Sequence, residues 1–245
     1  MRKHSRGFTL IELLVVIAII MILARILMPS LKGAKRAAYA AKCVSNQRQM
    51  IVAWRLFTDD RKGATIPYGW IDGSGDGITW MEKLAPYMGG EKIKTVRVCP
   101  EAPATKGSYI GTWSGVSQYS TPDGGYYFES ASDPNRKWLG SYGYNTYMFV
   151  GQPFTAASNC FLNTNQIPQP SESPVLADAM WVDMLPAPSD PNPPCSPTTG
   201  CGSPQMGRVY LARHTNKGIY IAFADGSVRD AKLGELWSFK WGRNW

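Results

Sequence analysis

Met1–Gly7 (MRKHSRG) and Phe8–Ala24 (FTLIELLVVIAIIMILA) begin the chain and decide its fold. The first stretch is short and basic, and the second is apolar apart from Thr9 and the single carboxylate of Glu12. A charged side chain inside a membrane-spanning helix costs about 2.5–3.5 kcal/mol, so such a residue usually has a function and a partner. Glu12 lies close to the start of the apolar stretch, where an amino terminus created by cleavage after Gly7 could pair with it.

An ordinary export signal and a plain membrane anchor are the two simpler interpretations of this region. A secretory signal ends its short apolar core at a small-residue cleavage site, whereas this apolar pattern continues without one. Phe8–Met28 has the length of a membrane span, because about 20 residues cross a bilayer. An anchor alone, however, does not account for Glu12 or for a glycine at the charge boundary. Three basic residues precede the apolar stretch: Arg2, Lys3 and Arg6. By the positive-inside rule they predict a cytoplasmic amino terminus, with everything after about residue 28 exported.

The basic start, Gly7 at the charge boundary, Phe8 and Glu12 together resemble the leader of type IV pilins and pseudopilins. The resemblance implies that a prepilin peptidase cleaves between Gly7 and Phe8 and methylates the new amino group of Phe8. It also implies that Glu12 pairs with that amine on a neighbouring subunit, while the apolar helices bundle into a filament core. Residues 1–7 are then a leader peptide, and we expect the chain to be a substrate of the peptidase and not an enzyme.

Pro29 follows the apolar stretch, at a place where many type IV pilins also carry a proline. An interior proline removes one helix hydrogen bond and clashes with the preceding turn, so it either ends the membrane helix or kinks it. We expect a kink, because residues 29–60 again have helical composition. A helix from Phe8 to about Thr58 would be about 75 Å long at 1.5 Å per residue, with residues 8–28 in the membrane or filament core.

Residues 29–60 are predicted to form an amphipathic stalk that packs one face on the head. The apolar positions of this face recur mostly every three or four residues, as they do on one side of a helix. They are Leu31, Ala34, Ala38, Ala41, Val44, Met50, Trp54 and Phe57.

Residues 61–245 provide enough chain for one exported globular head. The full chain of 245 residues has a net charge of +8, and removal of the leader leaves 23 basic and 18 acidic residues. Much of the excess lies between Arg25 and Arg55, which we interpret as a solvated helix face with some attraction to acidic lipid headgroups near Arg25. The head has no strip of basic and aromatic residues, so no nucleic-acid partner is expected.

Five cysteines follow the apolar stretch, in the exported part where disulfides form: Cys43, Cys99, Cys160, Cys195 and Cys201. Cys195 and Cys201 flank a short Pro/Gly loop that could close locally. Cys43 and Cys99 could tie the stalk to the head, which leaves Cys160 over. The sequence does not fix the pairing. It contains neither a Cys-x-x-Cys motif nor a nearby pair of histidines, so a zinc site is not expected.

The head is a series of short segments broken by glycine and proline. A long helix followed by such segments indicates an α+β fold, with the helix packed on an antiparallel sheet that has long loops. Trp80–Met88 predicts a short helix that ends at Gly89-Gly90. Gly69–Gly77 and Pro186–Pro204 are loops by composition.

Strands are predicted at Ser141–Val150 and Ser173–Trp181, and a hairpin is predicted from Gly218–Ala224 and Ser227–Asp230. Between the hairpin strands, Asp225-Gly226 predicts a two-residue turn in which both central residues have positive φ.

Several motifs of the head together resemble pilin-like proteins of planctomycete- and verrucomicrobial-type bacteria. They are Cys43-x-x-Asn46-x-x-Gln49, Trp80-x-x-x-Leu84-x-Pro86-Tyr87, Cys99-Pro100, Ser141-Tyr-Gly-Tyr-Asn145 and Arg213-His214 before Phe223-Ala-Asp225-Gly226. In that group a histidine is followed after nine residues by Asp-Gly, whereas ten residues separate His214 from Asp225 here. The resemblance therefore implies an architecture and an export route, but no fixed geometry between His214 and Asp225.

One acid–base pair in the head is worth considering. His214 could pair with Asp178 or Asp225 after folding, but the simpler interpretation is that Asp225-Gly226 forms a turn and His214 hydrogen-bonds within the head. The sequence lacks the motifs of serine hydrolases, phosphate-binding loops and metalloproteases.

One calcium loop is also worth considering. Asp72, Ser74 and Asp76 alternate as oxygen ligands do in such loops, but the position for the closing acid is Lys83, and Glu82 falls one residue early. We expect a flexible turn there and no cofactor, with calcium as the alternative.

Three classes of function fit these observations. The leading one is a pseudopilin of a type II secretion system, and the second is a major or minor subunit of a type IV pilus. Both imply prepilin peptidase, other pilin or pseudopilin subunits and the inner membrane as partners, with the head in the periplasm or on an extracellular filament. The third is a pilin-anchored binding module, for example for carbohydrate. Its motivation is the set of aromatic residues Trp70, Trp80, Trp113, Tyr119, Tyr126, Tyr127 and Trp138, although such residues more often build a core.

Overall fold

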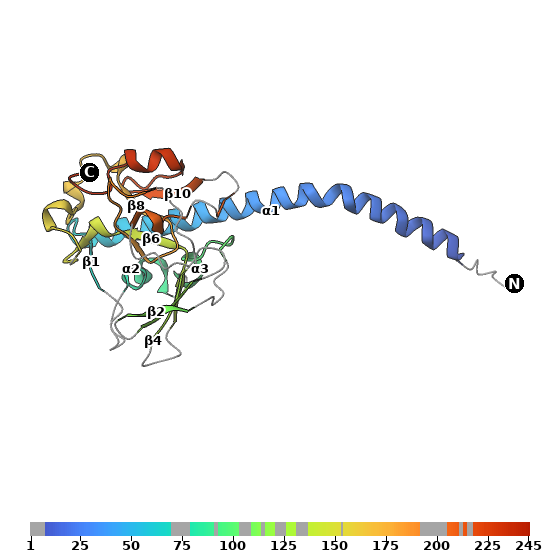
Figure 1. Cartoon of the computed structure of the whole chain (residues 1–245), viewed down its shortest axis with the longest axis horizontal. Coiled ribbons are helices and arrows are strands. Elements are labelled where there is room, and N and C mark those ends of the chain that lie inside the picture. The colour runs from blue at the N-terminus through green and yellow to red at the C-terminus, as the bar shows by residue number, and fades with distance from the viewer. Residues whose placement is uncertain are drawn as a thin grey trace. The chain divides into compact units, whose positions relative to one another are not determined.

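The computed structural model describes residues 8–69, 79–90, 93–102, 109–113, 116–120, 126–130, 137–152, 154–191, 205–210, 213–214 and 218–245 (Figure 1). The chain divides into two units, Met1–Ala38 and Tyr39–Trp245. The first holds the beginning of the long helix α1 (Leu10–Asp60), and the second holds the remainder of α1 together with the head. This layout is the predicted α+β arrangement of a long amino-terminal helix and a β-rich head.

Helix α1 runs without a break through Pro29. The predicted continuation of the helix beyond the proline is therefore confirmed. Next to the proline, the hydroxyl of Ser30 donates a hydrogen bond of 2.8 Å to the carbonyl oxygen of Leu27. The large apolar side chains from Phe8 to Leu31 are exposed, and the helix is long and apolar enough to cross a membrane.

The buried face of α1 begins later than predicted. Met50, Trp54 and Phe57 are buried as expected, and Val44 is half-buried, but Leu31, Ala34, Ala38 and Ala41 are exposed. The first buried residue of the helix is Cys43, and the polar side chains of Asn46 and Gln47 share its face because each finds a backbone carbonyl as partner. Periodicity alone extends the face too far, because alanine fits helix positions whether or not they are covered.

The main sheet of the head has five strands in the order β11-β10-β8-β6-β9. They are β6 (Tyr142–Asn145), β8 (Pro174–Asp178), β9 (Asp183–Met184), β10 (Gly218–Phe223) and β11 (Val228–Lys232). All neighbours are antiparallel except β6 and β9, which pair in parallel. The prediction of an antiparallel sheet is therefore wrong for this pair.

The described residues also form two smaller sheets. The first is antiparallel, in the order β2 (Tyr109–Trp113), β3 (Val116–Ser120), β4 (Tyr126–Ser130) and β5 (Lys137–Gly140). The second pairs β1 (Ile66–Pro67) with β7 (Phe149–Val150) in parallel.

Short helices fill much of the rest of the head. The predicted helix at residues 80–88 is confirmed as α2 (Trp80–Leu84) followed by the 3₁₀ turn η1 (Ala85–Met88). It ends at Gly89, whose φ of 78° is left-handed and favours glycine. The other helical segments are α3 (Ile93–Val96), η3 (Thr146–Met148), η4 (Ala157–Asn159), η5 (Thr164–Gln166), η6 (Pro170–Glu172), η7 (Gln205–Arg208) and η8 (Leu233–Ser238).

Two strand predictions need correction. The segment Ser141–Val150 is not one strand, because the 3₁₀ turn η3 separates β6 from β7; the side chain of Asn145 caps this turn by accepting from the backbone N–H of Tyr147. The strand within Ser173–Trp181 ends at Asp178.

The hairpin of β10 and β11 is confirmed, but its turn differs from the prediction. Gly226 has a φ of 91°, whereas Asp225 does not have a positive φ. The backbone N–H of Gly226 donates to the carbonyl of Phe223, and the backbone N–H of Phe223 donates in turn to the carbonyl of Ser227. This is the longer hairpin loop in which one left-handed glycine forms a bulge.

Strand β10 separates the two clusters of the hydrophobic core. Ile219, Ile221 and Phe223 point to one face, where they pack with the carboxy-terminal residues Phe239 and Trp241. The other face meets the head part of α1, and in Figure 1 β8 and β10 lie on one side of this part while α2 and α3 lie on the other. The head part of α1 therefore packs on both β-strands and short helices, while residues such as Arg48 and Val52 stay exposed.

Candidate functional site

At the amino-terminal end of α1, Thr9 and Glu12 form reciprocal hydrogen bonds. The backbone N–H and the hydroxyl of Thr9 both donate to one carboxylate oxygen of Glu12, each at 2.8 Å. The hydroxyl of Thr9 in turn accepts from the backbone N–H of Glu12 at 3.3 Å. This is a capping box, in which residues three apart satisfy the free N–H groups of the first helical turn. Phe8 is exposed beside it, whereas Gly7 lies outside the described residues.

The sequence analysis did not predict that Glu12 caps its own helix. It treated the carboxylate as lacking a partner within its own chain, although Thr-x-x-Glu before an apolar stretch is itself the signature of a capping box. Glu12 therefore has a local partner in the isolated chain, and any contact with a neighbouring subunit has to compete with Thr9.

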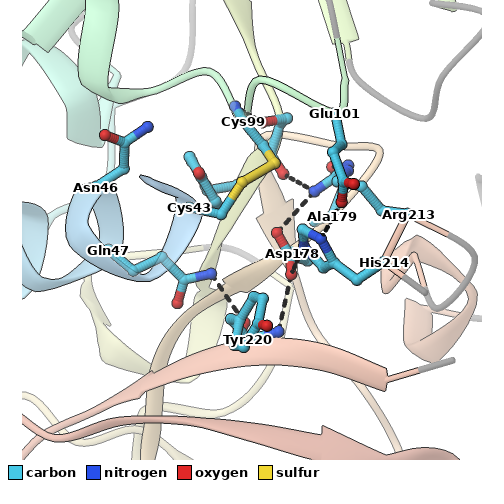
Figure 2. Close-up of polar contacts among 12 residues, drawn as sticks. Cys43, Asn46, Gln47, Cys99, Glu101, Asp178, Ala179, Arg213, His214 and Tyr220 are labelled. Carbon is cyan, nitrogen blue, oxygen red and sulfur yellow. Dashed lines mark hydrogen bonds and ion pairs between the residues drawn. A yellow bond between two sulfur atoms is a disulfide. The ribbon is translucent and has the colours of Figure 1, made fainter. Parts of the chain in front are cut away.

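A buried polar cluster in the head centres on Asp178, the last residue of β8 (Figure 2). One carboxylate oxygen accepts from Nη1 of Arg213 at 2.8 Å, and neither side chain is exposed. The other oxygen accepts from Nε2 of His214 at 3.0 Å and from the backbone N–H of Tyr220 at 2.8 Å. Asp178 thus binds a strand, a guanidinium and an imidazole with its two oxygens.

His214 is held between two carboxylates. Its Nδ1 lies 2.5 Å from an oxygen of Glu101, opposite the contact of Nε2 with Asp178, and its side chain is 2% exposed. Both ring nitrogens face carboxylate oxygens, which suits an imidazolium because that form donates from both nitrogens. Arg213 and His214 then balance the charges of Asp178 and Glu101.

The pKa values of the two central groups follow from these contacts. Burial by itself lowers the pKa of His214, but the hydrogen bond and charge of Asp178 and the hydrogen bond to Glu101 outweigh it, so the pKa is raised. Burial likewise acts to raise the pKa of Asp178, but the hydrogen bond from His214 and the charge of Arg213 outweigh it, so the pKa is lowered. Both shifts in pKa favour the charged form of the group.

Arg213 also joins the cluster to backbone groups next to β6 and β8 of the main sheet. Its Nη1 donates to the carbonyl of Ser141 at 2.6 Å, and its Nη2 donates to the carbonyl of Ala179 at 2.9 Å. The planar guanidinium with its fixed donors suits this combination of carboxylate and carbonyl acceptors.

A disulfide beside the cluster ties α1 to the head. Cys43 and Cys99 are bonded, which is one of the pairings that the sequence left open. The backbone N–H of Cys99 donates to the hydroxyl of Ser141 at 2.6 Å, and on α1 the amides of Asn46 and Gln47 donate to the carbonyls of Val98 and Tyr220. Cys160 is a buried free thiol, and its burial raises its pKa. Cys195 and Cys201 lie outside the described residues.

The cluster does not suit a metal ion. Cys43, Cys99 and His214 bring two sulfurs and a ring nitrogen close together. Cysteine binds zinc as a thiolate, however, and these two sulfurs are bonded to each other. The calcium positions Asp72, Ser74 and Asp76 lie outside the described residues.

The cluster is also poorly suited to proton transfer to a substrate. Both nitrogens of His214 already bond to carboxylates, and its side chain is almost fully covered. What the arrangement can do is hold β6, β8, β10 and α1 together by charge and hydrogen bonds.

The structure separates the two parts of the predicted carboxy-terminal motif. His214 lies before β10, in the polar cluster, whereas Asp225 and Gly226 lie after β10, in its hairpin turn. There the carbonyl of Asp225 accepts from Nη1 of Arg55 on α1 at 2.8 Å. Of the two candidate partners of His214, Asp178 is the one in contact.

Three of the aromatic residues that motivated a carbohydrate site are core residues. Trp80, Tyr126 and Trp138 are all buried, and their polar atoms bond within the head. The side chains of the other four lie outside the described residues: Trp70, Trp113, Tyr119 and Tyr127.

Comparison with known proteins gives one match. Residues 2–26 match the model of the prokaryotic N-terminal methylation motif. No curated protein and no solved structure matches the chain. The match covers the leader and the apolar beginning of α1, and it supports a type IV pilin-like or pseudopilin-like protein.

Proposed function

We propose that this pilin-like protein is a filament subunit, which prepilin peptidase cleaves between Gly7 and Phe8 and which assembles through α1. The observation that carries the proposal is the continuity of the methylation motif with one helix of 51 residues. The apolar side chains of its first part are exposed in the single chain. Burying them in a bilayer before assembly, and among other helices afterwards, removes that surface from water in both states.

Glu12 is proposed to pair with the methylated amine of Phe8 on a neighbouring subunit. In the single chain the carboxylate caps its own helix through Thr9. A second acceptor oxygen and a full negative charge remain available for a cation, because a carboxylate accepts several hydrogen bonds. The pairing in an apolar surrounding would select the correct axial position of neighbouring helices.

The head is proposed to act as a rigid, non-catalytic body. The Cys43–Cys99 disulfide joins α1 to the segment before β2, and the amide of Gln47 joins α1 to β10. Asp178 in turn joins β8 to β10. A subunit that is pushed or pulled through its helix needs such a connection, since force on α1 is then transmitted to the whole head. We propose the cytoplasmic membrane as the site before assembly, with the head on the exported side.

Within this class, we propose a type II secretion pseudopilin first and a type IV pilus subunit, major or minor, second. A helix for assembly and a rigid head serve both systems. Deletion of the gene separates them: loss of exported enzymes from the medium with normal pili indicates the pseudopilin, and loss of pili with normal secretion indicates the pilin.

The first experiment is the intact mass and amino-terminal sequence of the protein extracted from membranes. We expect a chain that begins at N-methylated Phe8 and lacks Met1–Gly7. Gly7→Ala should remain uncut, and Glu12→Ala should be cut but should fail to enter filaments. An uncut wild-type chain, in a cell that processes other prepilins, would overturn the proposal, as would normal incorporation of Glu12→Ala.

A further inference from the structure

The charges of the chain are divided unevenly between α1 and the rest. Residues 13–58 contain seven basic residues and no acidic one, whereas residues 59–245 contain 16 basic and 17 acidic residues. The positive excess of the cleaved chain therefore lies on residues 8–58. Between Leu13 and Trp54 no carboxylate lies one helical turn from a basic residue.

Four of the seven bases form a stripe at the end of the apolar stretch: Arg25, Lys32, Lys35 and Arg36. All four side chains are exposed. At 3.6 residues per turn, Arg25, Lys32 and Arg36 lie within about 40° of one another around the axis, and Lys35 lies about 60° further on. On the side opposite Arg25, Lys32 and Arg36 the same segment carries Leu27, Ala34 and Ala38. We call the four bases the basic stripe.

The basic stripe is placed where it would meet the surface of a bilayer. If Phe8–Met28 spans the membrane, Arg25 lies within the end of the span, where a long side chain reaches the headgroups. Arg36, the last of the four, lies eight residues beyond Met28, about 12 Å along the axis. This distance is close to the Debye length of about 8–10 Å at physiological salt, so all four charges are within reach of a charged surface.

We propose that the basic stripe binds the headgroups of anionic phospholipids in the leaflet from which α1 emerges. The position of Arg25 inside the apolar stretch favours lipid over a soluble polyanion such as nucleic acid, which would have to reach into the membrane to contact it. Because the apolar side of the segment faces away from the stripe, lipid binding leaves that side available to a neighbouring helix. The proposal rests on the membrane span but not on filament assembly.

The expected size of the effect follows from the number of bases. A base near an anionic surface contributes about 1 kcal/mol, or about fivefold in affinity. The neutral substitutions Lys32→Gln, Lys35→Gln and Arg36→Gln in one chain should together lower the affinity for anionic lipid by about 100-fold.

The test uses the full-length protein in nanodiscs of phosphatidylcholine with a minor share of phosphatidylglycerol. Native mass spectrometry counts the two lipids that remain bound after gentle release. We expect wild-type protein to retain phosphatidylglycerol several-fold above its share in the disc and to lose this enrichment in high salt. The triple glutamine variant should lose it, and Lys32→Arg with Lys35→Arg should keep it.

A matched control variant removes three positive charges that lie outside the basic stripe: Arg48→Gln, Lys240→Gln and Arg243→Gln in one chain. Arg48 is exposed on the same helix but lies about 30 Å beyond Met28, and this variant should retain the enrichment. No enrichment in the wild type, or equal enrichment in the triple glutamine variant of the stripe, would overturn the proposal. So would a short DNA duplex that binds wild-type protein in neutral nanodiscs and also displaces the anionic lipid in the mixed ones, because the stripe would then be a nucleic-acid surface.

Discussion

Asp178 and Arg213 form an ion pair of 2.8 Å in which neither side chain is exposed to solvent. The pair joins the end of β8 to the segment before β10, and His214 adds a second positive charge to the same carboxylate. Such pairs add little stability over an apolar replacement, but the loss of one member strands the other charge in the interior.

We therefore expect Asp178→Asn to destabilise the head strongly. The variant leaves Arg213 and His214 without their shared counter-charge, which costs about 3–5 kcal/mol. Thermal unfolding of the full-length protein in detergent, followed by tryptophan fluorescence, should show a Tm lower by roughly 10 °C. The matched control is Glu172→Gln, which breaks the exposed pair of Glu172 with Arg229 at 3.2 Å and should change stability by about 1 kcal/mol or less. Equal effects of the two variants would show that the buried pair has no special role.

The stability of the head should fall as the pH rises above about 6.5, the unfolded pKa of histidine. The pKa of His214 is raised in the folded protein, so its contribution is complete below the unfolded pKa of about 6.5 and is lost as the pH passes through the folded value. Deprotonation removes one hydrogen from a ring whose nitrogens both face carboxylates. His214→Gln should be less stable than wild type below about pH 6.5 and should lack this alkaline decline. A wild-type profile that is flat from neutral to alkaline pH would contradict the imidazolium assignment.

Removal of the Cys43–Cys99 disulfide should destabilise the head by about 4 kcal/mol, the chain-entropy value for a loop of this length. The two residues are separated by 56 positions, so the bond restricts a long part of the unfolded chain. Cys43→Ser with Cys99→Ser should unfold at lower denaturant than wild type, and a reducing agent should remove this difference. Reduced wild-type protein should match the double variant, and a difference between the two would mean that the serines perturb the site beyond the loss of the bond.

Gly226→Ala tests the turn that differs from the prediction. The residue has a φ of 91°, and a side chain there costs about 1–2 kcal/mol. A Cβ would also lie 2.9 Å from Nη1 of Arg55, which bonds to the neighbouring carbonyl of Asp225. The control Gly234→Ala has nothing within 4 Å of the added Cβ, and its unfolding free energy should change by about 0.5 kcal/mol or less. If both glycines tolerate alanine equally, the left-handed turn is not a requirement of the hairpin.

The parts of the fold that the sequence predicted well depend on local patterns. The long helix follows from its composition, the helix at Trp80 from its ending at Gly89, and the hairpin from Asp225-Gly226 between two strands. Each signal lies within about ten residues, so it does not require knowledge of the tertiary contacts.

The parts that were missed depend on contacts between distant residues. Glu101 is 113 positions from His214, and a lone glutamate beside a proline gives no sign of such a partner. The parallel pairing of β6 with β9 is likewise set by how the chain returns after β8. The sequence offered Asp178 or Asp225 as a partner of His214, and only the packing of β8 against β10 distinguishes the two.

The two roles of Glu12 can be separated by comparing three variants. Glu12→Gln keeps an acceptor for the N–H of Thr9 and so keeps the cap, but it loses the charge that would pair with the amine of Phe8. Thr9→Ala removes the hydroxyl partner and keeps the charge. If charge pairing drives assembly, Glu12→Gln should be cleaved normally and fail to enter filaments as Glu12→Ala does, while Thr9→Ala should assemble.

The measurement is the amount of each variant in sheared filaments, relative to the cleaved protein left in the membrane. Normal assembly of Glu12→Gln, together with a defect in Thr9→Ala, would show that the capping box is the function of this acid. The span would then tolerate Glu12 because its carboxylate satisfies the first turn of α1, where unpaired N–H groups in an apolar surrounding are costly.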